Sequence, residues 1–185
     1  MSTKPVHFSI IQRTLHWVMA VMVIAMLFIG ITMVSTVGPV FVTLVDVHKP
    51  LGIAILVLVL VRLIVRWRLG VPPLPANVLP VQVAVVHLSH WLLYALLLVM
   101  PLIGWGMLSA GGYPIALWGP IHLPQILPHN DMLYAYLRRG HTLLAYLFFA
   151  VILLHIVAAL FHGLILRDGV LERMASVRTG RGHTR

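Results

Sequence analysis

The sequence predicts an all-α membrane protein built as a bundle of four transmembrane helices. Hydrophobic residues make up 61% of the 185 residues and charged residues only 9%, which is not the composition of a soluble domain. Four apolar runs occupy 15–34, 50–65, 83–108 and 142–166. Each is close to the roughly 17–25 residues that a spanning helix needs, although the second is slightly short and needs its flanks. None alternates like a barrel strand, so the runs indicate helices.

We expect one domain over residues 1–185, with helices at about 14–35, 48–67, 82–108 and 141–166. Gly38 and Pro39 are expected to break the chain between the first two helices, and Pro50 suits the first turn of the second. The stretch 110–139 is too polar and too broken to span. We therefore predict that it forms a partly buried cap on the extracytoplasmic surface.

The positive charges are distributed unevenly between the two sides of this topology. The formal net charge is +9. If the N-terminus is cytoplasmic, only Lys49, Arg138 and Arg139 lie on the opposite side, and the other lysines and arginines face the cytoplasm. This asymmetry predicts cytoplasmic N- and C-termini, and contact with lipid headgroups, not with nucleic acid. The sequence contains no cysteine, which excludes disulfides, iron–sulfur clusters and thiolate metal sites.

Histidines recur at a fixed spacing in these apolar runs. His141 and His155 are fourteen residues apart, so on one helix they point nearly the same way and lie about 21 Å apart. Intramembrane ionisable groups are costly and usually functional. In the predicted topology His16 shares the cytoplasmic level with His155, and His48 shares the extracytoplasmic level with His141. The four histidines therefore form two pairs at two depths.

Three explanations of these pairs are open. Each histidine could be an interhelical hydrogen-bonding group. Zinc also binds imidazole, but its ligands converge on one tetrahedral point, and residues about 21 Å apart along one helix cannot converge. Two b-type haems, each held by two axial imidazoles, fit the paired depths best. Bis-histidine iron has no open coordination position, so it transfers electrons and does not bind oxygen.

Basic residues near each level are candidates for binding the haem propionates. A propionate is an anion that is costly to bury unless it is paired with a donor. Arg13 and Arg62 lie at the cytoplasmic level and are the expected partners there. Lys49, with Arg138 or Arg139, is the candidate at the other level.

The remaining candidates lie along the last helix or near the cytoplasmic haem. Phe148 is midway along the histidine stripe and is expected to pack between the two macrocycles. His87, His90 and His162 could bond propionates, or they could bind a quinone headgroup and carry its protons. Arg66 is expected to be an ordinary headgroup anchor.

Longer motifs resemble the bacterial cytochrome b561 family over nearly the whole chain. They are RTLHW, VHKPLGIAILVLVLVRLIVRW followed by PP, HLSHWLLYALLLVMPLIGW, and GHTLLAYLFFAVILLHIVAALFHGLILRDGVLERM. The nearest kind of member is the short di-haem type that acts as a superoxide oxidase. This resemblance implies a multi-pass protein of the bacterial inner membrane that exchanges electrons with ubiquinone. It also implies axial ligands at His16, His48, His141 and His155.

Two functions are consistent with this resemblance. As a superoxide:ubiquinone oxidoreductase, the protein would take electrons from periplasmic superoxide, which Lys49, Arg138 and Arg139 would attract electrostatically. As an alternative, it would be a cytochrome b subunit that conducts electrons between a periplasmic redox partner and the quinone pool. That partner would be a dehydrogenase or a soluble cytochrome.

Overall fold

The computed structural model describes residues 8–73 and 80–175. Within these ranges four helices are long and apolar enough to cross a membrane, which confirms the predicted fold class. They are α1 (Ile10–Ser35), α2 (Pro39–Leu69), α3 (Pro80–Ala110) and α4 (Asp131–Leu160). A π-helical turn, η1 (Phe161–Leu166), continues α4, and the short elements are β1 (Ile115–Trp118), β2 (Ile121–Leu123) and α5 (Glu172–Ala175).

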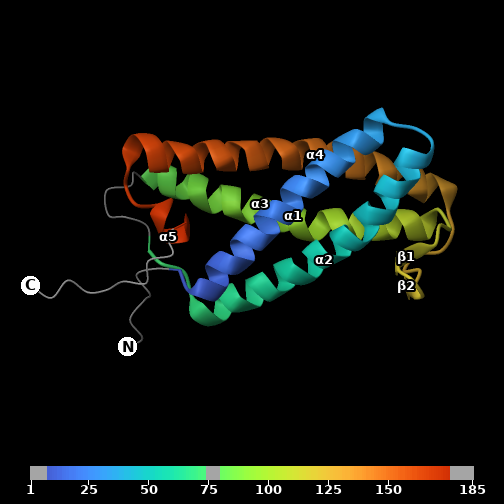
Figure 1. The fold of residues 1–185 in the computed structure, drawn as a ribbon, viewed down its shortest axis with the longest axis horizontal. Helices are drawn as coiled ribbons and strands as arrows, with labels where there is room; N and C mark the ends of the chain where they lie inside the picture. Colours follow the sequence, from blue (N-terminus) through green and yellow to red (C-terminus); the bar gives the residue numbers. More distant parts are fainter. Residues whose placement is uncertain (1–7, 74–79, 176–185) are drawn as a thin grey trace, which may run out of the picture.

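The four long helices form a bundle with two distinct ends. Helix α3 packs along α4 and α1 along α2, while α2 also contacts α3. Figure 1 shows α3 and α4 side by side along the long axis, with α1 and α2 inclined to them. We call the end with the β1–β2 hairpin and the α1–α2 turn the hairpin end. The opposite end, with the start of α1 and helix α5, is the α5 end.

Helix α1 begins a turn earlier than the expected residue 14. Ser9 is its N-cap and forms a capping box with Gln12, in which each side chain bonds to the other residue's backbone N–H. This arrangement satisfies two N–H groups that a helix start leaves without partners. The Gln12 amide also donates to the carbonyl of Gly70 at 2.8 Å, which ties α1 to the end of α2.

The predicted start of the second helix is wrong, because α2 begins at Pro39 and not at about residue 48. Gly38 has φ +77°, a conformation that suits glycine, and Pro39 then occupies the first turn, where its missing N–H is harmless. Pro50 consequently lies inside the helix, where it is buried. His48 is therefore an interior residue of a long helix.

The predicted start of the last helix is also wrong, because α4 begins at Asp131 and not at about residue 141. The Asn130 side chain caps it by accepting a hydrogen bond from the N–H of Leu133 at 2.9 Å. An acidic residue in the first turn suits the positive end of the helix dipole. The non-spanning segment is thus shorter than the predicted 110–139.

The segment between α3 and α4 contains a two-stranded antiparallel hairpin that packs against α2. Ile115 pairs with Leu123, and a bulge interrupts the pairing near Trp118. Trp105 of α3 donates from its indole Nε1 to the carbonyl of Pro124 at 2.9 Å. The hairpin is therefore attached to the bundle through both α2 and α3.

A buried apolar cluster lies between α3 and α4, at mid-height. Leu96, Phe148 and Val151 form it, each less than a tenth exposed. Many other large apolar side chains of the four helices are exposed. A soluble domain would not leave such a surface to water, so this exposure agrees with a lipid surrounding.

Candidate functional site

The first pair of histidines lies towards the hairpin end, between α2 and α4. The ring centroids of His48 and His141 are 6.3 Å apart with an interplanar angle of 68°. Both Nδ1 atoms are buried, and neither has a hydrogen-bond partner of ordinary geometry within the described residues. Helix α3 approaches closely through Gly104, where an added Cβ would lie 3.4 Å from Cε1 of His141. The pair is thus held between three helices.

The second pair lies towards the α5 end, between α1 and α4. The ring centroids of His16 and His155 are also 6.3 Å apart, with an interplanar angle of 74°. The structure therefore brings together the same two pairs that the sequence predicts. It does so although the starts of α2 and α4 differ from the prediction, because the fourteen-residue spacing along α4 does not depend on where that helix begins.

The spacing within each pair fits two imidazoles bound to one metal ion. With an imidazole–metal bond of about 2 Å on each side, the ring centroids would lie about 6 Å apart. Among the described residues no group of three or more histidine, cysteine, aspartate or glutamate side chains could hold a metal ion. Zinc needs such a group. The pairs instead fit a metal that carries its other ligands with it, as haem iron does.

A third imidazole lies close to the second pair. The ring of His90 is 5.7 Å from that of His155 and nearly perpendicular to it. Its Nδ1 is 2.7 Å from the carbonyl oxygen of Val86, and because a carbonyl only accepts, this nitrogen carries the proton. The lone pair of His90 is therefore on Nε2. His87, one turn earlier on α3, is exposed.

An arginine and a tyrosine adjoin the second pair. Arg62 of α2 donates from Nη1 to Nδ1 of His16 at 3.0 Å and from Nε to the hydroxyl of Tyr94 at 3.1 Å. Arg66 lies over the same tyrosine ring, its Cζ 5.7 Å from the centroid. Arg13 is half-buried on α1, one turn before His16. The sequence analysis did not single out Tyr94, although it lies one turn after His90 on α3.

His162 has an acidic partner that the sequence analysis also missed. Its Nδ1 is 2.5 Å from Oδ2 of Asp168, in the turn that follows η1. Partial desolvation would raise the pKa of Asp168. The hydrogen bonds from His162 and from the Val170 N–H outweigh it, and the pKa stays below its ordinary value. Asp168 is therefore an ionised acceptor at neutral pH, and it orients the His162 ring.

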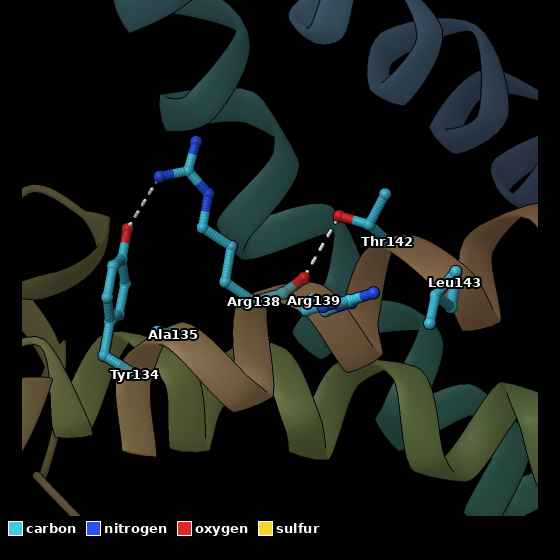
Figure 2. A pocket seen from close by; sticks show the side chains of 6 residues that line it. All are labelled: Tyr134, Ala135, Arg138, Arg139, Thr142 and Leu143. Carbon is cyan, nitrogen blue, oxygen red and sulfur yellow. Dashed lines mark hydrogen bonds between the residues drawn. The ribbon is translucent and has the colours of Figure 1, made fainter. Parts of the chain in front are cut away.

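The three cations predicted at the hairpin end have different surroundings. The ammonium of Lys49 is largely buried and pairs with Asp46 at 3.0 Å, so its charge is partly neutralised. Arg138 and Arg139 are exposed and line a shallow depression on α4 (Figure 2). Figure 2 shows the two guanidinium groups extending in different directions, with Arg138 reaching towards the hydroxyl of Tyr134 at 3.5 Å.

Phe148 separates the two levels along α4. It lies midway between His141 and His155 in the chain and packs with Leu96 of α3 in the buried core. Its side chain is 8% exposed. Apolar packing between the two pairs is thus an observed feature of this helix.

A bundle of apolar helices with facing imidazoles inside it defines a class, the b-type cytochromes of membranes. The family model described as prokaryotic cytochrome b561 matches residues 7–176. The chain belongs to this family, which implies that it binds haem, and the predicted family is confirmed.

Several known proteins are similar to this chain. A Yersinia pestis protein named "Probable superoxide oxidase CybB" is 36% identical over 134 residues, which are 72% of this chain and 76% of that protein. "Cytochrome b561 homolog 2" of Escherichia coli is 28% identical and covers 94% of this chain and 93% of its own length. "Cytochrome b562" of Cereibacter sphaeroides is 31% identical, covering 95% and 99% respectively. The chain is thus a multi-pass membrane protein of electron transfer.

Proposed function

We propose that the protein is a superoxide:ubiquinone oxidoreductase of the bacterial inner membrane that holds two b haems. The observation that carries this proposal is the pair of imidazole sites at two depths, each with a centroid separation of 6.3 Å. Two one-electron sites in series can connect one membrane surface to the other. The similarity to a protein named as a probable superoxide oxidase supports superoxide as the donor.

In this proposal each pair of histidines holds one haem. His48 and His141 are the ligands towards the hairpin end, and His16 and His155 are the ligands towards the α5 end. Bound haem b supplies reversible one-electron transfer without an open iron position. The balanced reaction oxidises two superoxide ions to two dioxygen molecules and reduces one quinone, which takes up two protons, to quinol.

Exposed cations support the hairpin end as the entry point for superoxide. Arg138 and Arg139 are exposed at the depression on α4, and their positive charge would raise the local concentration of a small anion. Lys49 contributes less to this field, because Asp46 lies 3.0 Å from its ammonium. In the predicted topology this end faces the periplasm.

The pair of His162 and Asp168 supports the α5 end as the place where quinone is reduced. With Nδ1–H donating to this carboxylate, the His162 ring can bond a quinone oxygen and transfer a proton to it when Nε2 also carries a proton. His87 is exposed at the same end and could exchange protons with solvent. His90 could bond a propionate or the quinone only when Nε2 is protonated as well, because its Nδ1–H already donates to Val86. In the predicted topology these protons come from the cytoplasm.

A second candidate function is electron conduction from a periplasmic protein, and the hairpin favours it. Trp118 is 64% exposed and Ile121 57% exposed, so an apolar surface surrounds the turn between β1 and β2. A redox partner that docks on this surface would deliver electrons close to His48 and His141. Other relatives are named only as cytochromes, which is compatible with this alternative.

The test is a pulse of superoxide given to the purified, oxidised protein under anaerobic conditions, with and without ubiquinone. We expect the low-spin spectrum of haem b at two haems per chain, rapid reduction by superoxide, and reoxidation only when quinone is present. Two haems that do not respond to superoxide would favour the conduit. A purified protein without haem would contradict both functions.

A further inference from the structure

Tyr94 joins two arginines near the histidine pair of the α5 end. Its hydroxyl accepts a hydrogen bond from Nε of Arg62 at 3.1 Å, and the Cζ of that guanidinium is 5.9 Å from the ring centroid. The Cζ of Arg66 is 5.7 Å from the same centroid. Both distances are within the range of a cation–π interaction. One tyrosine of α3 thus fixes two cations of α2.

No carboxylate neutralises these two cations within residues 8–73 and 80–175. The ion pairs found in those ranges involve Lys49, His129 and His162, and none of them includes Arg62 or Arg66. Arg62 and Arg66 are both half-buried in a spanning helix. Two unpaired, half-buried cations at one level are costly unless an anion binds between or beside them.

The hydrogen-bonding chemistry of Arg62 indicates where such an anion must lie. Guanidinium groups only donate, so Nδ1 of His16 accepts in the contact at 3.0 Å. A neutral imidazole that binds iron through one nitrogen carries its proton on the other and becomes a donor. Arg62 then needs another acceptor for Nη1 while its Nε stays on Tyr94. A carboxylate of haem bound at this level would supply that acceptor.

We propose that Tyr94 is a positioning residue that holds Arg62 and Arg66 as a pair of cations for the propionates of the haem at the α5 end. This inference rests on the proposed haem-binding function. It assigns Arg66 to the haem site, whereas the sequence predicts a headgroup anchor. A haem propionate and a lipid phosphate are both oxygen anions, so a lipid phosphate is the competing ligand for these two arginines.

The experiment is a potentiometric titration of both haems in the full-length protein in detergent or nanodiscs. Cations near the iron favour the reduced, less positive form, so losing their position lowers the potential of one haem. We expect Tyr94→Leu to change the ratio of oxidised to reduced haem about tenfold, which corresponds to 59 mV for one electron. Tyr94→Phe keeps the ring and should change this ratio about threefold.

Three further variants make the result specific. Arg66→Leu should shift the same haem in the same direction. Arg68→Leu removes an equal charge from the exposed end of α2, where its Cζ lies over Trp67 and not Tyr94, and should shift neither haem. His16→Ala identifies which titration wave belongs to the α5 end.

Four outcomes would overturn the inference. Unchanged potentials in both Tyr94 variants, or equal shifts of both haems, would contradict a positioning role. A shift in the Tyr94 variants without one in Arg66→Leu would assign Arg66 to a lipid phosphate and contradict the two-cation arrangement. Absence of haem from the wild-type protein would overturn the proposed function together with this inference.

Discussion

At the scale of single residues, His155 has two imidazole neighbours, and their ring nitrogens differ. His16 lies 6.3 Å away, and its Nδ1 accepts from Arg62. His90 lies 5.7 Å away, and its Nδ1 donates to a backbone carbonyl. The family resemblance implies that His16 is the axial partner, whereas distance alone does not separate the two. The substitutions His16→Ala and His90→Ala distinguish which of the two is the axial partner.

We predict that His16→Ala loses the haem of the α5 end and keeps that of the hairpin end. About half of the reduced haem b absorbance should disappear, because one of two bis-histidine sites has lost a ligand. His90→Ala is the matched control and should keep both haems. Optical spectra and haem assays of purified protein measure both. Loss of one haem in His90→Ala, with none lost in His16→Ala, would contradict the proposed ligand pair.

The sequence did not reveal Tyr94 and Asp168, whose roles depend on contacts that only the folded chain makes. Tyr94 meets Arg62 across 32 positions, and a tyrosine in an apolar helix is most often a packing residue. Asp168 is only six positions from His162, but a π-turn and a left-handed Arg167 bring them together. Neither the turn nor the positive φ has a sequence signal that helical periodicity would detect.

At the scale of elements, η1 and the segment after it form a strap across the α5 end. The indole Nε1 of Trp17 donates to the carbonyl of Met174 at 3.2 Å, and Arg173 donates to the carbonyl of Pro73 at 2.5 Å. The strap therefore contacts both α1 and the segment after α2. The strap contains both His162 and Asp168, so it orients the proposed proton donor.

We predict that Asp168→Asn slows reoxidation of the haems by ubiquinone at least about tenfold, because a general acid or base at this position loses its oriented partner. Reduction by superoxide at the other end should be unchanged. Glu172→Gln removes an exposed acid of α5 and is the matched control. Stopped-flow spectra with and without quinone measure both steps. Equal slowing of both steps would instead indicate general damage to the bundle.

The same carboxylate gives the strap a dependence on pH. The folded pKa of Asp168 is lowered, so its ionised form contributes stability at neutral pH, and this contribution is lost as the pH falls through the folded pKa. We predict that the protection factors of the amides in residues 161–175, which are the intrinsic exchange rate divided by the observed rate at each pH, fall on acidification in the wild-type protein. The fall should be smaller in Asp168→Asn, which has no carboxylate to protonate. Equal falls in both proteins would contradict the role of this carboxylate.

At the scale of the whole molecule, the charges at the hairpin end determine how the rate of reduction by superoxide should depend on salt. Arg138 and Arg139 are exposed, and screening acts over about 8 Å at physiological ionic strength. The rate of reduction by superoxide should therefore fall as salt increases. Lys49 should contribute less to the attraction of superoxide, because it is largely buried beside Asp46.

We predict that the double variant Arg138→Gln, Arg139→Gln lowers the rate constant for superoxide about tenfold at low salt and removes most of its salt dependence. Lys49→Gln should change this rate much less. Stopped-flow reduction at a series of ionic strengths measures the effect. The same salt dependence in the wild-type protein and the double variant would show that these arginines do not attract the anion.

The sequence by itself determined the fold class, the number of spanning helices and the two pairs of histidines. Hydrophobic runs and a fourteen-residue spacing are local properties of a helix, and they persist wherever it begins. The tertiary structure alone decided the starts of α2 and α4, the hairpin, the pairing of Lys49 with Asp46, and the contacts of Tyr94 and Asp168. These depend on caps, turns and side-chain directions, which hydrophobic periodicity does not encode.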